Sequence, residues 1–263
     1  MKKGAIILII LILLVFPVAK SEDILDIEKK TVALTFDDGP SDYTKDILDL
    51  LDKYNAYATF FVIGNKALIY KETVMNIVAK GNEIGNHTYS HPWLTHLSVS
   101  ETIEELDKTN DLIFDITGTK PTLFRPSYGD INIKVKKAID MEIVMWNNDS
   151  NDWRYRSSKT IAARVIRNIN DGDIVIMHDT YKRSYEALKI IIPKLKEMDY
   201  QIVTVSQLKE IEKLRNDSWY KTRRIWNSKY SANHNFIIYN SSYCIHFFKL
   251  KWKIQIIIQW RNY

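Results

Sequence analysis

Residues 31–39 read TVALTFDDG, an apolar run that ends in two adjacent carboxylates, Asp37 and Asp38. Like charges this close disfavour each other's ionisation, so a folded chain tolerates them where a cation lies nearby or where one carboxylate must accept a proton. The later stretch HTYSH places His87 and His91 four positions apart. One Asp with two His residues is a three-ligand set that leaves coordination positions open, as catalytic metal sites do. The other Asp is then free to act as a base, and the pattern predicts a metal-dependent hydrolase.

Short apolar runs alternate with helical patterns on both sides of this stretch. The expected strands are 31–36, 58–62, 83–86, 122–125, 142–146, 173–177 and 201–205. The expected helices are 44–54, 66–80, 99–116, 131–139, 159–169 and 184–198, with a last one from Gln207. Ser98 and Glu101 have the spacing of a capping box before the third helix. Strands separated by helices pair in parallel, so the chain predicts an α/β fold with a barrel-like layout.

Polar and charged residues follow the ends of several expected strands. The carboxyl ends of parallel strands form the rim where α/β folds bind ligands. The convergence of charged residues on one rim is difficult to explain by packing alone. These residues are Asp37 and Asp38, His87, Arg125, Asp149 and His178.

Each motif also has a structural interpretation. Asp37 and Asp38 before Gly-Pro fit an ordinary turn, Arg125 could pair with a surface acid, and a buried His178 could be a core residue. In the functional interpretation, Arg125 holds Asp37 ionised and backbone N–H groups near Tyr128 face a developing oxyanion. His178 at the rim then suits a general acid.

Taken together, these segments resemble the polysaccharide deacetylases of the NodB-like type, carbohydrate esterase family four. The resemblance covers about residues 31–210. Ser127 departs from the commonest family pattern, which has a second Pro there, and this puts the rigidity of its loop in doubt. The five motifs that carry the resemblance are TFDDG (35–39), HTYSH (87–91), RPSYG (125–129), DSNDW (149–153) and IMH (176–178).

The resemblance implies a distorted (β/α) barrel of about seven parallel strands that removes N-acetyl groups from amino-sugar polymers. It implies a divalent metal, Zn²⁺ ahead of Co²⁺ or another divalent ion. Asp152 would orient either His178 or Arg125, and these two assignments stay open. The implied roles are Asp37 as base, Asp38, His87 and His91 as metal ligands, Arg125 as the residue that tunes Asp37, Tyr128 as backbone oxyanion stabiliser, His178 as acid, and Trp153 and Met177 as lining of the acetyl pocket.

The expected partner is an N-acetylated glycan polymer, with peptidoglycan N-acetylglucosamine ahead of chitin or another exported glycan. A hypothesis of a different class is a catalytically silent glycan-binding protein on the same fold. We expect a monomer. Aromatic residues near the motifs, Trp93 among them, could stack on sugar rings.

The N-terminus predicts export. Lys2 and Lys3 precede an apolar run over residues 5–18, which is short for a membrane span of about 20 residues and typical of a signal peptide. Residues 1–21 are therefore interpreted as a cleaved signal or a retained signal anchor, with a buried helix as a third alternative. Both leading interpretations place the body outside the cytoplasmic membrane, with membrane contact through this segment.

The lone Cys244 excludes an intramolecular disulfide.

The formal net charge of +5 is unevenly distributed. Residues 215–263 contain nine of the 37 Lys and Arg residues but one of the 32 acidic ones, so the body is slightly acidic. Nothing in the body suggests a nucleic-acid surface. We expect a deacetylase domain over 28–212 and a basic, aromatic-rich tail over 213–263. The tail could bind an anionic surface, form an extra helix or strand pair, or be foreign to the ancestral domain.

Overall fold

The computed structural model of the chain describes residues 25–217, 238–240, 243–250 and 253–259. The chain divides into two compact units, residues 1–211 and 212–263. The expected signal or anchor segment, 1–21, lies outside the described residues. In the part of the chain that is described, no helix has both the length and the hydrophobicity needed to cross a membrane.

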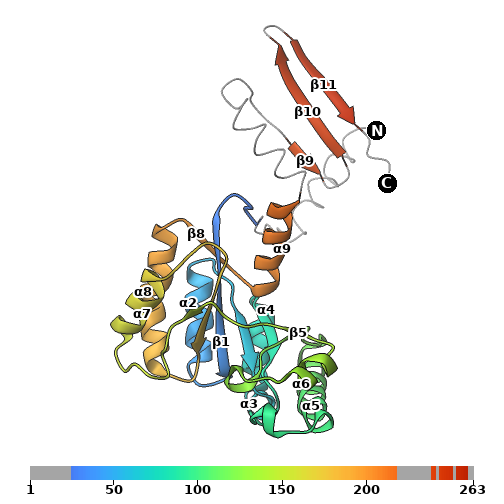
Figure 1. Ribbon diagram of the computed structural model, residues 1–263. Helices are drawn as coiled ribbons and strands as arrows, with labels where there is room; N and C mark the ends of the chain where they lie inside the picture. Colours follow the sequence, from blue (N-terminus) through green and yellow to red (C-terminus); the bar gives the residue numbers. More distant parts are fainter. Residues whose placement is uncertain (1–24, 218–237, 241–242, 251–252, 260–263) are drawn as a thin grey trace, which may run out of the picture. The chain divides into compact units, whose positions relative to one another are not determined.

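Strands and helices alternate through the first unit (Figure 1). Its strands are β1 (Lys30–Gly39), β2 (Thr59–Val62), β3 (Glu83–Asn86), β4 (Leu123–Phe124), β5 (Glu142–Ile143), β6 (Asn148–Asp149), β7 (Asp173–His178) and β8 (Tyr200–Val203). Its helices are α2 (Thr44–Lys53), α3 (Gly64–Ile69), α4 (Lys71–Ala79), α5 (Val99–Thr117), α6 (Ile133–Ala138), α7 (Ser158–Arg167), α8 (Lys182–Glu197) and the start of α9 (Val205–Asn216), with short 3₁₀ turns η1 (Leu94–His96) and η2 (Ser127–Gly129).

Two local expectations can be compared directly with the backbone. The capping box before α5 is confirmed, because the Ser98 N–H donates to Glu101 Oε2 at 2.8 Å and the Glu101 N–H donates to Ser98 Oγ at 3.2 Å. The single helix expected over 66–80 is wrong, since α3 and α4 meet at Tyr70, whose φ of −104° and ψ of 42° are not helical. Backbone hydrogen bonds join the start of α3 to residues 88 and 89, whereas Val74 and Ile77 of α4 pack in the main hydrophobic core. The change of direction at Tyr70 allows the two helices to make these separate contacts.

All strand pairs of this unit are parallel. The sheet order is β5-β4-β3-β2-β1-β7-β6, and β8 also pairs with β1. Strand β7 runs along one side of β1, while β8 and then β2 occupy the other side, because β8 pairs with residues 30–33 and β2 with residues 35–39. The carboxyl ends of β1, β2, β3, β4 and β7 therefore point in one direction.

The strand expected over 142–146 is wrong in its extent, and the difference shapes the fold. Strand β5 pairs with β4 at one edge of the sheet, whereas β6 pairs with β7 at the other edge. Between them, the guanidinium of Arg125 donates to the carbonyls of Val144 at 3.1 Å and Met145 at 3.5 Å, so these carbonyls do not continue a strand ladder. Residues 142–149 thus connect both edges, and the parallel sheet curls into a half-barrel.

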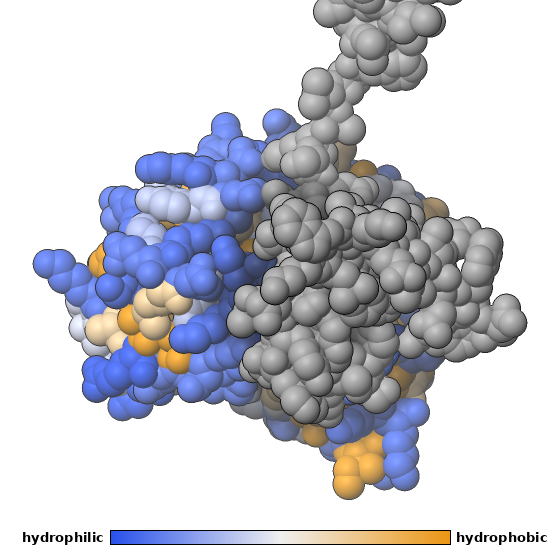
Figure 2. Space-filling model, turned by 90° about the horizontal axis from the view of Figure 1, so that it is seen from above, coloured by the Kyte–Doolittle hydropathy of each residue, from blue (hydrophilic) through white to orange (hydrophobic). Residues whose placement is uncertain are grey.

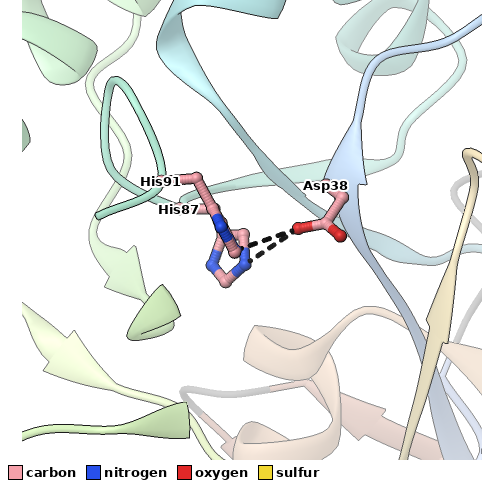
Figure 3. Close-up of side chains that lie close together, drawn as sticks. All are labelled: Asp38, His87 and His91. Atoms are coloured by element: carbon pink, nitrogen blue, oxygen red, sulfur yellow. Dashed lines mark ion pairs between the residues drawn. The ribbon is translucent and has the colours of Figure 1, made fainter. Parts of the chain in front are cut away.

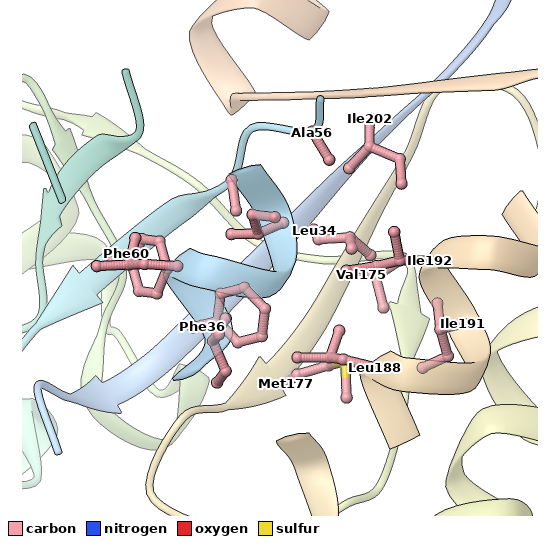
Figure 4. Packing of buried hydrophobic residues seen from close by; sticks show 14 of the residues in the cluster. Leu34, Phe36, Ala56, Phe60, Val175, Met177, Leu188, Ile191, Ile192 and Ile202 are labelled. Atoms are coloured by element: carbon pink, nitrogen blue, oxygen red, sulfur yellow. The ribbon is translucent and has the colours of Figure 1, made fainter. Parts of the chain in front are cut away.

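The side chains of β1 alternate between two environments. Leu34 and Phe36 enter the main hydrophobic core, where residues of β7 such as Val175 meet Leu188 and Ile192 of α8 (Figure 4). In Figure 1, α2, α7 and α8 lie on one side of β1, and α5 and α6 lie on the other. The described part of the face in Figure 2 is largely hydrophilic, with small, separate hydrophobic areas. The side chains that alternate with them along β1, including Thr35 and Asp37, point to the opposite face of the strand.

The described residues of the second unit contain a separate antiparallel sheet. Its strands are β9 (Ile238–Asn240), β10 (Tyr243–Leu250) and β11 (Lys253–Gln259), in the order β11-β10-β9. Cys244 pairs with Gln259 and Leu250 with Lys253 in the β10–β11 register. The apolar run 254–258 of the tail therefore lies in a strand.

Candidate active site

The sequence-predicted side chains meet at the carboxyl-terminal rim of the sheet. Asp37 and Asp38 lie near the end of β1, and His87 follows β3 directly. Arg125 follows β4, and His178 is the last residue of β7. The register places Asp37 beside His178 on neighbouring strands. Parallel pairing thus brings residues as much as 141 positions apart to one place.

Asp38, His87 and His91 form one cluster (Figure 3). The Nε2 atoms of His87 and His91 lie 3.4 and 3.2 Å from Asp38 Oδ1. One potential ligand atom of each residue lies within 4.8 Å of the others. Both imidazoles point toward the carboxylate in Figure 3. The three expected ligands are therefore together, with their lone-pair atoms facing a common point.

One hydrogen bond orients the ring of His87, and others hold the loop that leads to His91. His87 Nδ1 lies 2.7 Å from the carbonyl oxygen of Arg125, so Nδ1–H donates to that carbonyl and Nε2 is turned toward Asp38. The loop between the two histidines is held by Glu105 of α5. Its carboxylate accepts from the N–H groups of Tyr89 at 2.9 Å and Ser90 at 2.7 Å.

The backbone here adopts conformations that non-glycine residues rarely use. The φ angles of Asp38, Thr88, His91 and Tyr128 are 69°, 67°, 62° and 61°. Such residues are uncommon and cluster at functional sites, where the surrounding structure holds the strain. Four in one region indicate that the fold maintains these side-chain directions at a conformational cost.

The chemistry of this cluster fits a divalent cation. Asp38 Oδ1 is buried and has no hydrogen-bond partner in the described part of the chain. Burial alone would raise the pKa of Asp38, but the nearby imidazoles of His87, His91 and His178 outweigh it and hold the pKa well below its usual range. A carboxylate oxygen and two imidazole nitrogens are ligands that Zn²⁺ accepts, and three protein ligands leave room for water and substrate.

Asp37 faces a different partner. Arg125 NH1 donates to Asp37 Oδ1 at 2.7 Å, and both side chains are buried. The same guanidinium donates to Thr35 Oγ1 at 2.7 Å and lies 4.1 Å from the centre of the Phe61 ring. Buried charges persist when they are paired and hydrogen-bonded, so the arrangement stabilises the ionised form of Asp37.

His178 is held by Asp152, which does not contact Arg125 in any described interaction. Nδ1–H of His178 donates to Asp152 Oδ1 at 2.7 Å, and the His178 backbone N–H donates to Asp152 Oδ2 at 2.7 Å. The hydroxyl of Ser184 donates to the same Oδ2 at 2.5 Å. Burial lowers the pKa of His178, but the Asp152 carboxylate outweighs this and raises the pKa to about 9. An imidazolium ready to donate a proton is the result.

The aromatic residues of the site lie at its surface. The Tyr128 ring contacts the edge of His91, with centroids 4.4 Å apart, and stacks on Trp93 at 4.0 Å. Trp93 and Tyr128 are 46% and 52% exposed, which leaves them available for a sugar ring. Trp153 is also exposed. Ser127, whose loop was in doubt, is buried and lies 3.1 Å from Thr88 through their hydroxyls, so it links two motif loops.

Met177 does not lie where the resemblance implied. It pairs in register with Phe36, on the opposite face of β7 from His178, and it packs fully buried in the main core (Figure 4). The alternation of side chains along a strand sends neighbouring residues to opposite faces. The expectation that Met177 lines an acetyl pocket is corrected accordingly.

Four further residues support the site. Thr35 and Glu105 act through the bonds described above, and Lys66 Nζ donates to the Asp38 carbonyl at 2.7 Å. Asp179 is buried behind Gly39, where a Cβ on the glycine would lie 2.2 Å from Asp179 Oδ2. Two of them had a sequence signal: Asp179 lies next to His178 at a strand end, and Thr35 begins the TFDDG motif, although no role was expected for either. Lys66 and Glu105 lie inside helices, where nothing in the sequence marks them.

Comparisons with known proteins agree with this geometry. A family model described as polysaccharide deacetylase matches residues 25–145. Over 195 residues the chain is 46% identical to the peptidoglycan-N-acetylmuramic acid deacetylase PdaC of Bacillus subtilis, covering 74% of this chain and 42% of PdaC. A solved PdaC structure is similar with a TM-score of 0.73 and 45% identity, covering 77% of this chain and 100% of that one.

Two further relatives differ from PdaC in length or activity. A peptidoglycan-N-acetylglucosamine deacetylase of Bacillus cereus is 38% identical over 189 residues, which cover 68% of this chain and 88% of the relative. A solved structure of a carbohydrate esterase family four pseudoenzyme from Bacillus anthracis is 35% identical with a TM-score of 0.65, covering 70% of this chain and 66% of that one. The chain spans about two fifths of the length of the first curated relatives.

Proposed function

This chain belongs to the polysaccharide deacetylase family, and we propose that it is a metal-dependent hydrolase that removes N-acetyl groups from an exported glycan, peptidoglycan. One observation carries the proposal. The Asp38, His87 and His91 cluster lies at the same rim as a buried Asp37–Arg125 pair and an Asp152–His178 pair. These are the parts that amide hydrolysis needs: a cation site, a base and an acid.

Each pair has a defined task in the proposed reaction. Asp37, stabilised as a carboxylate by Arg125, accepts a proton from the water that attacks the acetyl carbonyl carbon. His178, protonated through its contact with Asp152, donates a proton to the amide nitrogen as the C–N bond breaks. Backbone N–H groups near Tyr128 stabilise the oxyanion. The products are acetate and a free amino sugar.

Asp38, His87 and His91 would hold the divalent ion, for which we propose Zn²⁺. When bound, such an ion acts as a Lewis acid toward a carbonyl oxygen and lowers the pKa of water. Two observations support a divalent ion at this place. The three residues supply one carboxylate and two imidazoles, and the buried Asp38 Oδ1 has no hydrogen-bond partner among the described residues.

The proposed substrate is the N-acetylglucosamine of peptidoglycan, acted on by an exported monomer. The name of PdaC refers to N-acetylmuramic acid and that of the Bacillus cereus relative to N-acetylglucosamine, so both sugars of the polymer are represented among relatives. The exposed Trp93–Tyr128 stack suits either sugar ring. Chitin or another exported N-acetylated glycan is the alternative.

Acetate release tests the proposal. The full chain is incubated with acetylated peptidoglycan and with chitin oligomers, each with Zn²⁺, with Co²⁺ and with a chelator. We expect metal-dependent acetate release from peptidoglycan, with mass spectrometry locating the free amine on glucosamine. A free amine on muramic acid would overturn the sugar assignment alone.

A catalytically silent glycan-binding protein is the second candidate, since the family includes the Bacillus anthracis pseudoenzyme. Such a protein would bind the same polymers but release no acetate with any metal. The presence of a base, an acid and a cation cluster in this chain supports the enzyme over this alternative.

A further inference from the structure

A pocket of about 500 Å³ opens near His178, the proposed general acid, because Tyr181 in its lining neighbours the His178 ring. It lies where the segments after β1 and β7 meet the start of α7, and residues from all three line it. The lining residues used below are Arg156, Tyr181, Lys182, Arg183 and Glu186.

The pocket is rich in positive charge. Arg156, Lys182 and Arg183 contribute three cations, and Glu186 is the one acid among the lining residues. That acid is engaged with Lys189 at 2.6 Å on the same helix. Neither Arg156 nor Lys182 forms an ion pair within the described residues. The positive charge of the pocket is therefore not neutralised by the part of the chain that the structure describes.

The start of α8 breaks a local rule at this pocket. The 16-residue helix begins with Lys182 and Arg183, has no acid in its first turn and has no side-chain cap. Cations at a helix N-terminus oppose the helix dipole, which favours anions there. Places where a sequence breaks such a rule are often functional, and an anion in the pocket would offset the repulsion.

Arg183 joins the pocket to the catalytic residues. Its Nε–H donates to the Asp152 carbonyl at 2.6 Å and its NH2 to the Trp153 carbonyl at 3.3 Å. The guanidinium also lies 3.8 Å from the centre of the Tyr181 ring, and that ring is 6.0 Å from the His178 ring. The guanidinium is thus fixed in orientation and keeps further N–H donors for a ligand.

We propose that Arg156, Lys182 and Arg183 form a subsite for a carboxylate carried by the glycan. The inference rests on the proposed deacetylase function and narrows its substrate. Guanidinium and ammonium groups bind carboxylates through charge-assisted hydrogen bonds. Chitin is neutral, whereas peptidoglycan carries carboxylates on its stem peptides, or on the lactyl group of a muramic sugar from which the stem peptide has been removed. A glycan whose acetylated sugar lies at His178 would place a neighbouring carboxylate in this pocket.

Three substrates and one double variant test this subsite. The full chain with Zn²⁺ is assayed on chitotetraose, on peptidoglycan glycan chains stripped of stem peptides, and on chains that keep them. The variant is R156E/K182E, and Arg183 is left intact because it binds the Asp152 backbone. We expect the ratio of kcat/KM for a carboxylate-bearing chain to kcat/KM for chitotetraose to fall about tenfold or more. Raising NaCl should shrink this ratio in the unmodified chain.

The two anionic substrates identify the source of the carboxylate. A fall for stripped chains alone assigns the free lactyl group, a fall only for chains with stem peptides assigns the peptide, and a fall for both shows that the pocket accepts either carboxylate. A matched control, K136E/K137E on α6, makes the same charge change away from the pocket and should leave both ratios unaltered.

Failure of this inference differs from failure of the proposed function. A ratio in R156E/K182E equal to that of the unmodified chain overturns the subsite while acetate release continues. The neutral variant R156Q/K182Q, with its unfolding temperature measured, separates lost charge from lost folding, and an unchanged ratio in a folded R156Q/K182Q also overturns it. An unmodified chain that releases no acetate from any substrate overturns the deacetylase function itself.

Discussion

Asp37 and Asp38 are neighbours in the chain but belong to opposite halves of the site. Asp37 is completed by Arg125 at 2.7 Å, a partner the chain itself supplies. Asp38 faces two imidazoles at 3.2–3.4 Å, with a buried oxygen that no hydrogen bond satisfies among the described residues. In the Asp37 half, which we call the closed half, the carboxylate already has a cationic partner. In the Asp38 half, which we call the open half, it still requires a cation. The contrast shows how two adjacent carboxylates can both stay charged in a largely buried place.

A third carboxyl, Asp179, extends this comparison. It is buried like Asp37, but the described residues offer it the hydroxyl of Thr44 at 2.5 Å rather than a cation. Burial raises its pKa to about 7. The charges of the three acids are thus offset in three ways: Asp37 by an arginine, Asp38 by a bound ion in our proposal, and Asp179 by a proton below about pH 7.

Removing a ligand from the open half should have the largest effect. We expect His87→Ala to bind no stoichiometric Zn²⁺ and to lose acetate release by about a thousandfold or more, because a Lewis acid supplies several kcal/mol. Metal content by mass spectrometry and acetate release measure the two losses. His96→Ala, outside the cluster, is the control, and full metal occupancy in His87→Ala would contradict the assignment.

A substitution at Asp37, in the closed half, should lower the rate of the reaction without affecting metal binding. We expect Asp37→Asn to keep its Zn²⁺ but to lose about 10²–10⁴ in kcat, since proton transfer by a positioned base is worth this much. The measurements are kcat and metal content on the same preparation. Loss of metal together with activity would show that the two halves are not independent. Full activity would refute the role of Asp37 as the base.

The Asp152–His178 pair should give a pH effect of intermediate size. The pKa of His178 is raised to about 9 in the folded chain, against an ordinary value of 6.5. The stability from this pair is therefore fully present below about pH 6.5 and is lost as the pH rises through about 9. We expect Asp152→Asn to lower the unfolding temperature of the metal-free protein more at pH 6 than at pH 9.5. An equal loss at both pH values would contradict the coupling.

Asp179 should give the smallest effect, and its contribution to stability, like that of His178, is lost as the pH rises. Its pKa is raised from 3.8 to about 7, so the folded chain holds its proton while the unfolded chain releases it. Stability from this group is present below about pH 4 and is lost as the pH rises through about 7. The isosteric Asp179→Asn removes this loss, and its unfolding temperature relative to the unmodified chain should rise between pH 5 and pH 8. A pH-independent difference would show that Asp179 does not titrate in this range.

Much of the fold and of the site's composition could be predicted from local sequence. Apolar runs of four to six residues between amphipathic stretches gave the strand positions, because burial on both faces imposes that composition. The gathering of charged residues at one edge of the sheet could also be predicted, since parallel strands align their carboxyl ends. The divided strand at 142–149 and the break at Tyr70 were missed. Both depend on contacts with distant parts of the chain, such as the Arg125 guanidinium on the Val144 carbonyl.

The amino-acid sequence alone determined which chemical groups the rim carries and in which order along the chain. The tertiary structure decided which group touches which. It paired Asp152 with His178, sent Met177 into the core and joined Arg183 to the backbone beside the acid. The reason is physical: local periodicity fixes where each strand lies and ends, whereas partners across a sheet depend on strand order and register. Strand order and register are set by packing between segments far apart in the sequence, so they cannot be predicted from neighbouring residues.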